Sequence, residues 1–212
     1  MDLSVERTGE TGSSVVELLI VLVIIGVLAT MALVGVGDSR KQMLRMNLSR
    51  ELKVNMERSR FDAIKRRVVT LSEMATITFN SSTRYTVKYD VNQNGILEAA
   101  EARVIDLGSR SSVTITGTNL TFPATLYFDE NGNAVLRNAS STVITPILTL
   151  CDAGCQAPLS ATNATLLSIS PTGTVAMLPG GATVPTFSAP TITQLTTGTD
   201  INPAIKVPLT IK

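Results

Sequence analysis

Histidine and tryptophan are absent from this chain of 212 residues, and cysteine occurs only twice, as Cys151 and Cys155. Without histidine, the common imidazole metal sites and histidine-dependent catalytic triads are excluded. A zinc ribbon needs four thiols and is excluded as well. Because three residues separate the two cysteines, the pair predicts a small disulfide loop, which implies an oxidising compartment.

Sequence motifs of catalysis are also missing. Nothing in the chain resembles a nucleophile elbow, a phosphate-binding loop or a paired cysteine–histidine site, so we expect no enzyme. The formal net charge is only +1, but residues 40–67 hold ten Lys or Arg against three acids, and residues 68–212 hold seven against nine. The basic residues at the end of this segment, within 60–67, predict either the solvated end of a helix or a surface for nucleic acid or anionic lipid headgroups.

A long apolar run extends from Leu18 to Gly37, with Thr30 as its only polar residue. Its twenty residues would cover about 30 Å as a helix, the thickness of a bilayer's hydrocarbon core. A secretory signal peptide is the competing interpretation. It fits poorly, because the run is too long for a signal core and residues 1–12 carry one Arg and three acids in place of a basic region. We therefore predict a transmembrane helix.

Glu17 lies at the edge of this apolar run. A carboxylate in a membrane helix costs about 2.5–3.5 kcal/mol on insertion scales and is commonly functional. The alternative is a terminal acid that reaches back to the membrane interface without a further role. The residue by itself leaves both interpretations open.

The residues around Glu17 resemble the class III signal of type IV pilins and type II secretion pseudopilins. The matching stretches are GSSVVELLI at residues 12–20 and IIGVLA at residues 24–29. The resemblance implies that a prepilin peptidase cleaves between Gly12 and Ser13 and methylates the new amino terminus on Ser13. It also implies that Glu17, the fifth residue of the mature chain, neutralises the Ser13 amine of a neighbouring subunit, because a buried charge is tolerated when it is paired.

The same resemblance implies a location and a set of partners. We expect a single-pass protein of the bacterial inner membrane, with its C-terminal domain outside the cytoplasm and with a place in a filament after assembly. The partners would be other pilin or pseudopilin subunits, the prepilin peptidase and the inner-membrane assembly platform. Arg40 and Lys41 favour the opposite orientation by the positive-inside rule, but the predicted disulfide suits the external location.

Beyond Gly37 the helix is expected to continue to residue 67. Apolar residues of one face recur along it at Leu44, Leu48, Leu52, Met56, Ala63 and Ile64. The expected organisation of the helical part is a prepilin leader at 1–12, a transmembrane or filament-core helix at 13–37 and an amphipathic continuation at 38–67.

The remainder predicts a β-rich globular domain at 68–178, because runs of Val, Ile, Thr, Tyr and Phe alternate with Asn, Gly, Ser and Pro. Turns are expected at Asn94-Gly95, Asn131-Gly132 and residues 171–173. Residues 179–212 are rich in Thr and Pro and are expected to form a C-terminal extension. The fold class is therefore α+β, with a long N-terminal helix packed on a small antiparallel sheet or sandwich. The expected strands are 68–71, 75–79, 84–89, 103–107, 112–116, 124–128, 133–137, 143–150, 165–170 and 174–178.

Residues 90–101 match the calcium-binding loop of an EF-hand. Oxygen-bearing side chains occupy its first, third and fifth positions, glycine the sixth and glutamate the twelfth. The flanking segments, however, read as strands, and a plain Asn-Gly hairpin is the alternative to calcium. The calcium ligands would be Asp90, Asn92, Asn94, the carbonyl of Ile96, Glu98 through water, and Glu101.

Residues 60–71 resemble the GspH/FimT branch of minor pilins, in which an Arg, an Ala-Ile pair and basic residues precede a Val-rich strand. The resemblance implies a minor pilin or pseudopilin of a type IV pilus or type II secretion filament, at or near the tip. Competence members of the FimT type carry Gly-Arg-x-Arg after the final strand turn. Residues 173–176 read Gly-Thr-Val-Ala and lack both arginines, so nucleic acid is not the expected partner. A DNA-capturing competence pilin and a calcium-responsive surface adhesin remain the alternatives.

Overall fold

The computed structural model describes residues 14–67, 70–140, 143–144, 147–152, 154–155 and 158–185, without the side chains of residues 32–36 and 143. The chain divides into two compact units, Met1–Lys41 and Gln42–Lys212. The predicted leader and most of the predicted C-terminal extension lie outside the described residues.

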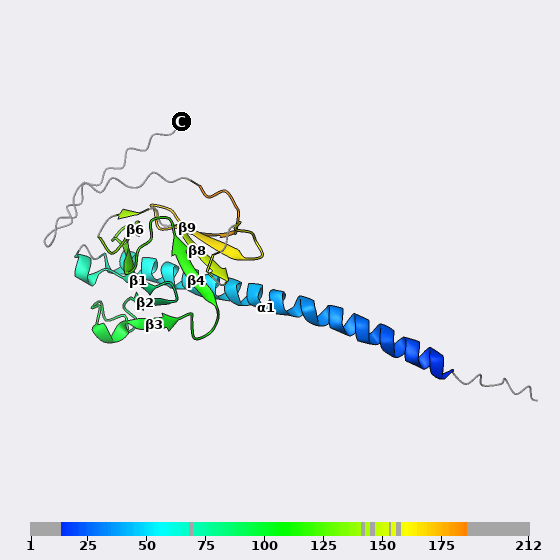
Figure 1. Cartoon of the computed structure of the whole chain (residues 1–212). Helices are drawn as coiled ribbons and strands as arrows, with labels where there is room; N and C mark the ends of the chain where they lie inside the picture. Colours follow the sequence, from blue (N-terminus) through cyan, green and yellow to red (C-terminus); the bar gives the residue numbers. More distant parts are fainter. Residues whose placement is uncertain are drawn as a thin grey trace, which may run out of the picture. The chain divides into compact units, whose positions relative to one another are not determined.

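Helix α1 spans Val15–Arg66 and contains 52 residues (Figure 1). It begins where the Ser14 carbonyl accepts hydrogen bonds from the amides of Glu17 and Leu18, at 2.9 and 3.2 Å. An acid in its first turn and basic residues in its last turn match the helix dipole. It ends at Arg67, where a positive φ of 50° turns the backbone out of the helix. A helix was predicted over residues 13–67, and α1 occupies that range to within two residues at each end.

The predicted transmembrane stretch, residues 13–37, corresponds to the N-terminal part of α1, which begins at Val15. Ser13 and the side chains of residues 32–36 lie outside the description. Among the residues that the structure describes, no helix combines the length and the apolar character that crossing a membrane requires.

In the second unit, the described residues form two antiparallel sheets over the C-terminal half of α1 (Figure 1). One sheet has the order β3-β2-β1-β5-β6-β7 and the other β10-β9-β8-β4. Two short 3₁₀ helices, η1 at Leu71–Glu73 and η2 at Ala99–Glu101, lie in the connections. The strands are β1 Thr76–Ser81, β2 Arg84–Lys88, β3 Arg103–Asp106, β4 Val113–Gly117, β5 Ala124–Phe128, β6 Ala134–Arg137, β7 Val143–Ile144, β8 Ile147–Asp152, β9 Ala164–Ile169 and β10 Val175–Pro179.

The turn between β5 and β6 is built by Asp129, whose Oδ1 accepts hydrogen bonds from the amides of Asn131 and Asn133, at 2.9 and 2.7 Å. Gly132 follows with a φ of 76°, a conformation that glycine adopts without steric cost. A Cβ at Gly132 would lie 2.7 Å from the Cδ1 of Ile64 on α1. The predicted Asn131-Gly132 turn is therefore confirmed, and the glycine also permits close packing on the helix.

The turn between β9 and β10 contains Gly173, which also has a φ of 76°. A Cβ there would clash with the Gly132 carbonyl and would lie 2.9 Å from Arg60. Arg60 Nε in turn donates a hydrogen bond to the Gly132 carbonyl at 3.1 Å. The hairpins of the two sheets thus meet each other and α1 at one point, which requires glycine in both turns.

The core of the second unit joins one face of α1 to both sheets. Four residues of the predicted apolar face are buried in it, namely Leu48, Leu52, Met56 and Ala63. Leu44 and Ile64 of the same face are half-buried, and Leu44 packs against this core. Polar residues occupy other buried positions of the same face: Arg45, Ser49, Asn55 and Ser59.

Three local predictions need correction. The strand expected at 68–71 is wrong in its described part, because Thr70 precedes η1 and Leu71 lies in it; residues 68–69 lie outside the described residues. The single strand expected at 143–150 is two strands, β7 and β8. Asn94-Gly95 lies in a long connection between β2 and β3 that includes η2, and not in a tight two-residue hairpin.

Candidate functional site

The first turn of α1 carries Glu17, the predicted assembly residue. Gly12 and Ser13, the predicted cleavage and methylation positions, lie outside the described residues. Glu17 lies in the first turn of α1 and is exposed. It is the only charged residue between Ser14 and Met31. The polar hydroxyl of Thr30 is satisfied inside the helix, where it donates to the Val27 carbonyl at 2.8 Å.

Large apolar side chains surround Glu17 and continue along this part of the helix. They occupy every side of α1, and each is between 49% and 80% exposed. A helix that is apolar all round is normally found in a protein core or in a membrane. The exposed side chains are Val15, Val16, Leu18, Leu19, Ile20, Val21, Leu22, Val23, Ile24, Ile25, Val27, Leu28 and Met31.

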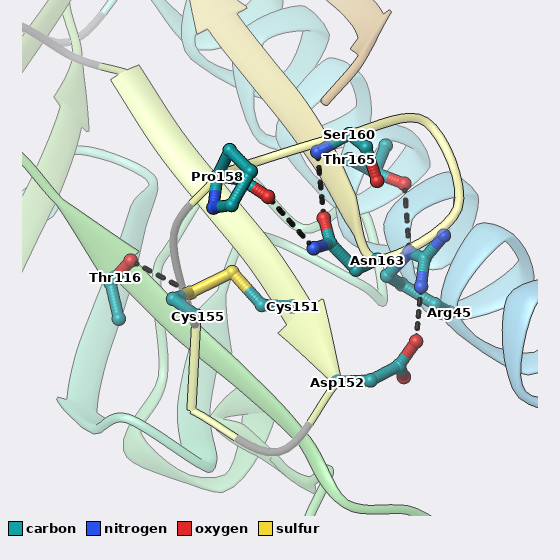
Figure 2. The surroundings of a disulfide bond; sticks show 9 residues. All are labelled: Arg45, Thr116, Cys151, Asp152, Cys155, Pro158, Ser160, Asn163 and Thr165. Atoms are coloured by element: carbon teal, nitrogen blue, oxygen red, sulfur yellow. Dashed lines mark hydrogen bonds and ion pairs between the residues drawn. A yellow bond between two sulfur atoms is a disulfide. The ribbon is translucent and has the colours of Figure 1, made fainter. Parts of the chain in front are cut away.

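The two cysteines form a disulfide at the end of β8, with Cα atoms 4.9 Å apart (Figure 2). The Sγ of Cys155 lies 3.2 Å from the Thr116 hydroxyl of β4. Cys151 is buried and pairs with Thr114 of β4 on one side and with Ala164 of β9 on the other. The disulfide therefore closes a short loop at the C-terminal end of β8, a strand that lies between β9 and β4 in its sheet.

Arg45 of α1 reaches the residue next to this disulfide. It is fully buried, and its guanidinium forms an ion pair with Asp152 (Figure 2). Its Nε donates to the Thr165 hydroxyl at 3.3 Å, and its Nη2 donates to the Ala161 carbonyl at 3.1 Å. A buried cation is tolerated only when it is paired and hydrogen-bonded, and these three acceptors satisfy that requirement.

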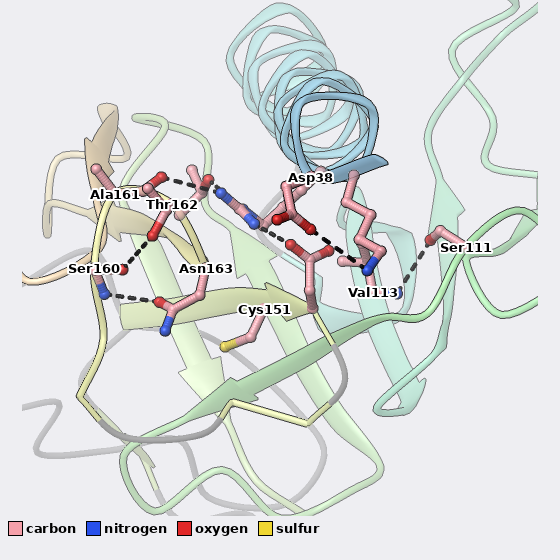
Figure 3. Close-up of polar contacts among 12 residues, drawn as sticks. Asp38, Ser111, Val113, Cys151, Ser160, Ala161, Thr162 and Asn163 are labelled. Atoms are coloured by element: carbon pink, nitrogen blue, oxygen red, sulfur yellow. Dashed lines mark hydrogen bonds and ion pairs between the residues drawn. The ribbon is translucent and has the colours of Figure 1, made fainter. Parts of the chain in front are cut away.

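One acceptor of Arg45, the Ala161 carbonyl, lies in the loop that precedes β9, and Asn163 holds this loop together. Asn163 Oδ1 accepts a hydrogen bond from the Ser160 amide at 2.7 Å, and its Nδ2 donates to the Pro158 carbonyl at 3.0 Å. Figure 3 shows Ser160, Ala161 and Asn163 in this loop, with Cys151 on the neighbouring strand. The disulfide, the loop and Arg45 thus form one structural cluster that fixes α1 to the four-stranded sheet.

The predicted calcium loop is folded on its own hydrogen bonds. The carboxylate of Asp90 accepts from the amides of Asn94 and Gly95, at 3.2 and 2.8 Å. The side-chain oxygens of Asn92 and Asn94 accept from the amides two residues later, at 2.9 and 2.8 Å. Asn94 Nδ2 donates to Glu98 Oε1 at 3.2 Å. These bonds link the residues of the loop to one another.

Glu101 closes the loop from its C-terminal end. Its carboxylate accepts hydrogen bonds from the amides of Val91, Asn92 and Glu98, at 2.8, 3.1 and 3.0 Å. The amide of Glu98, followed by those of Asn92 and Val91, lowers the pKa of the Glu101 carboxyl. Glu98 and Glu101 also cap η2 reciprocally.

The donor set of this loop fits calcium by residue type and order, since carboxylate and amide oxygens are calcium's usual ligands. Its geometry fits less well, because bidentate ligation by Glu101 would replace three hydrogen bonds to backbone amides. The carbonyl of Ile96 would be the one backbone ligand of the set. Within the described part of the chain, no group of three or more Cys, Asp or Glu is arranged to hold a metal ion.

The sequence did not reveal Arg45 or the charged cluster around it. Arg45 lies on the same helical face as Leu48 and Leu52. The spacing of the apolar residues along the helix is therefore compatible with burial of position 45. Its charge obscured that signal, because arginine is rarely buried without a partner. The partner, Asp152, is 107 positions away and gives no local pattern.

The chain matches no protein-family model, no curated protein and no solved structure. The resemblance to pilins and pseudopilins is therefore carried by the sequence motifs alone, at residues 12–29 and 60–71.

Proposed function

We propose that this chain is a pilin-like subunit, a minor pilin or pseudopilin of a type IV pilus or type II secretion filament. In this proposal the N-terminal part of α1 holds the chain in the inner membrane after cleavage at Gly12–Ser13 and later packs in the filament core. The β-rich unit stays outside the cytoplasm. One observation carries the proposal: the apolar surface of α1 between Val15 and Met31 is exposed on all sides of the helix.

The physical argument is the cost of leaving this surface in water. Thirteen large apolar side chains are about half exposed or more, and full burial of such a side chain is worth about 1.5–3 kcal/mol. Burying the set therefore gains on the order of 10 kcal/mol. Lipid before assembly and the helices of neighbouring subunits after assembly both supply this burial.

Glu17 gives this apolar surface its specificity. In this proposal the carboxylate meets an opposite charge of a neighbouring subunit at the same depth, because a buried charge is tolerated when it is paired. The amine of Ser13 in a neighbouring subunit, exposed by cleavage, has the required charge. The disulfide between Cys151 and Cys155 supports the external placement of the second unit, since such bonds persist in oxidising compartments.

Processing tests the proposal directly. Gly12→Leu places a bulky residue at the predicted cleavage position, and we expect it to block cleavage by prepilin peptidase. Gly9→Leu, which makes the same change three residues earlier in the leader, is the matched control and is expected to be cleaved. The intact mass of the wild type and of Gly9→Leu should correspond to loss of residues 1–12 and one added methyl group. An intact leader on assembled wild-type protein would rule out the pilin assignment.

A further inference from the structure

Cys151 and Cys155 close a covalent ring that contains Asp152, the ion-pair partner of Arg45 (Figure 2). We call residues 151–155 the disulfide ring. Asp152 is the last residue of β8, so strand pairing fixes the chain up to this residue and the disulfide fixes the chain that follows. The partner of a buried cation thus lies inside a ring that thiol chemistry opens and closes.

Arg45 is also the residue at which α1 first becomes buried. The described side chains that precede it on the helix are all exposed or half-buried, and the next buried residues are Leu48 and Ser49. The first buried contact of the helix is therefore made by a charged side chain and not by an apolar one. An apolar side chain stays buried without a specific partner, whereas a cation needs one.

The two members of the ion pair differ in their access to water. The side chain of Arg45 is 0% exposed and that of Asp152 is 18% exposed. Asp152 is also the only charged acceptor of the guanidinium, since the others are the Thr165 hydroxyl and the Ala161 carbonyl. A carboxylate that is no longer held in place can therefore turn to water where it is. Arg45 reaches water only if its part of the helix moves.

The two sulfur atoms differ in their access to a reductant. Cys151 is buried, whereas Cys155 is half-buried and its Sγ lies 3.2 Å from the Thr116 hydroxyl. A dithiol reductant therefore attacks the Sγ of Cys155, forms a mixed disulfide there and releases the Cys151 thiolate. The second thiol of the reductant then displaces Cys155. The reductant leaves as a disulfide, and each cysteine takes up a proton and becomes a thiol.

We propose that the disulfide ring is a redox-sensitive latch for the end of α1 at which its burial begins. With the ring closed, Asp152 is fixed beside Arg45, and residues 42–49 of the helix are docked on the four-stranded sheet. With the ring open, Asp152 turns to water, and the unpaired Arg45 leaves the core together with residues 42–49. Leu52 and Met56, which lie further along the helix and are fully buried, keep the rest of α1 docked.

The latch goes beyond the proposed function and does not depend on entry into a filament. It makes the last step of helix docking depend on the redox state of the compartment, because disulfides persist only under oxidising conditions. Oxidation of the two thiols by a disulfide-containing oxidant is the reverse of the exchange described above. If the second unit lies outside the cytoplasm, as proposed, docking of residues 42–49 is completed there.

Hydrogen exchange of the full-length chain in detergent, measured by mass spectrometry with and without dithiothreitol, tests the latch. Reduction should accelerate exchange at the amides of residues 42–49 by about tenfold, because an undocked helix end opens more often. The amides of residues 52–63 should change by less than about twofold, because this part stays docked. Alkylation of both cysteines in the quenched sample verifies that the ring is open.

Three variants identify the ion pair as the cause. In Arg45→Met an apolar side chain takes the buried position and needs no charged partner, so reduction should change exchange at residues 42–49 by less than about twofold. Arg50→Met makes the same change at an exposed position of the helix; it is the matched control and should keep the full response. Asp152→Asn keeps the ring but removes the charge, and it should exchange rapidly at residues 42–49 in both redox states.

Three results would overturn the latch. Unchanged exchange at residues 42–49 in the reduced wild type would show that strand pairing alone holds Asp152. Equal acceleration in the wild type and in Arg45→Met would show that the ring acts without the ion pair. Uniform acceleration over the whole second unit would mean that the disulfide only stabilises the fold in general. None of these results bears on the proposed function, which the leader variant Gly12→Leu tests separately.

Discussion

Tyr85 and Asn55 show how a buried polar pair connects α1 to the six-stranded sheet. The Tyr85 ring is fully buried in β2, and Asn55 Nδ2 of α1 donates a hydrogen bond to its hydroxyl at 3.2 Å. Burial raises the pKa of Tyr85 from 10.0 to about 12, although the hydrogen bond from Asn55 acts in the opposite direction. The folded state therefore holds this proton more tightly than the unfolded chain does.

Stability should consequently fall at high pH. The contribution of Tyr85 is fully present below its unfolded pKa of 10.0 and is lost as the pH rises through the folded value of about 12. The loss amounts to about 3 kcal/mol of the free energy of unfolding. Denaturant unfolding of the full chain between pH 9 and 12, with tyrosinate absorbance as a second signal, measures it. (This range starts below the unfolded pKa of 10.0 and ends at the folded pKa of about 12.)

Tyr85→Phe is the control for this prediction. It should cost about 1 kcal/mol at neutral pH, because Asn55 loses its partner, and it should remove this part of the decline at high pH. An identical decline in wild type and Tyr85→Phe would mean that other groups cause it.

Arg45 is a second polar residue in the core, and it shows a different balance of energies. Its ion pair with Asp152 adds little net stability compared with a well-packed apolar pair, because both charges are desolvated. It does make the packing specific, since only one placement of α1 against β8 and β9 satisfies all three acceptors of the guanidinium.

At the scale of elements, the loop between β2 and β3 tests the choice between a calcium site and a metal-free turn. The three hydrogen bonds that Glu101 accepts favour the metal-free turn. We expect the melting temperature of the full-length wild type to be the same in millimolar calcium and in chelator. Glu101→Gln should accelerate hydrogen exchange at the amides of Val91, Asn92 and Glu98, because a neutral amide is a weaker acceptor than a carboxylate.

Calcium would produce a different pattern in the same experiment. Ligand binding to the folded state raises the melting temperature by mass action, and a loop of this kind would bind at about 10⁻⁴ to 10⁻³ M. A calcium-dependent rise in the wild type that disappears in Glu101→Gln would contradict the metal-free turn and establish the site.

The elements that are determined by residues close together in the sequence could be predicted. The helix was predictable from its unbroken apolar run and repeat, and the Asn131-Gly132 turn from its local chemistry. The strand expected at 68–71 was wrong because a Val-rich stretch does not reveal that Leu71 begins a 3₁₀ turn. Sheet order was out of reach, because β1 pairs with β5 across three intervening strands and their loops.

The candidate site shows the same division. The motif around Glu17 is contiguous, so the sequence placed it in the first turn of the helix. The ion pair between Arg45 and Asp152 is 107 positions apart in the chain, and only the folded second unit brings it together. The basic cluster of the helix divides in a way that its composition does not show: Arg45 is buried on the face of Leu48 and Leu52, whereas Arg50 and Arg58 are exposed.

At the scale of the whole molecule, α1 consists of two chemically different parts. Its first part is apolar on all sides and carries one carboxylate. Its second part buries one face in the β-rich unit and exposes Arg50, Arg58 and Lys65. A filament subunit needs both, because one part must leave water and the other must hold a folded domain. In the proposed function these two demands are met by a single helix.

Glu17→Val separates insertion from assembly in this molecule. The substitution makes the apolar surface more uniform, so membrane insertion should be unchanged or better. Incorporation into filaments should fall by at least about tenfold, because the Ser13 amine of the neighbouring subunit is left as an unpaired charge. Thr30→Val makes the same helix more apolar without removing the carboxylate and should assemble normally. An immunoblot of sheared filaments beside the membrane fraction measures both quantities. Equal filament signals for Glu17→Val and Thr30→Val would show that the carboxylate has no role in assembly.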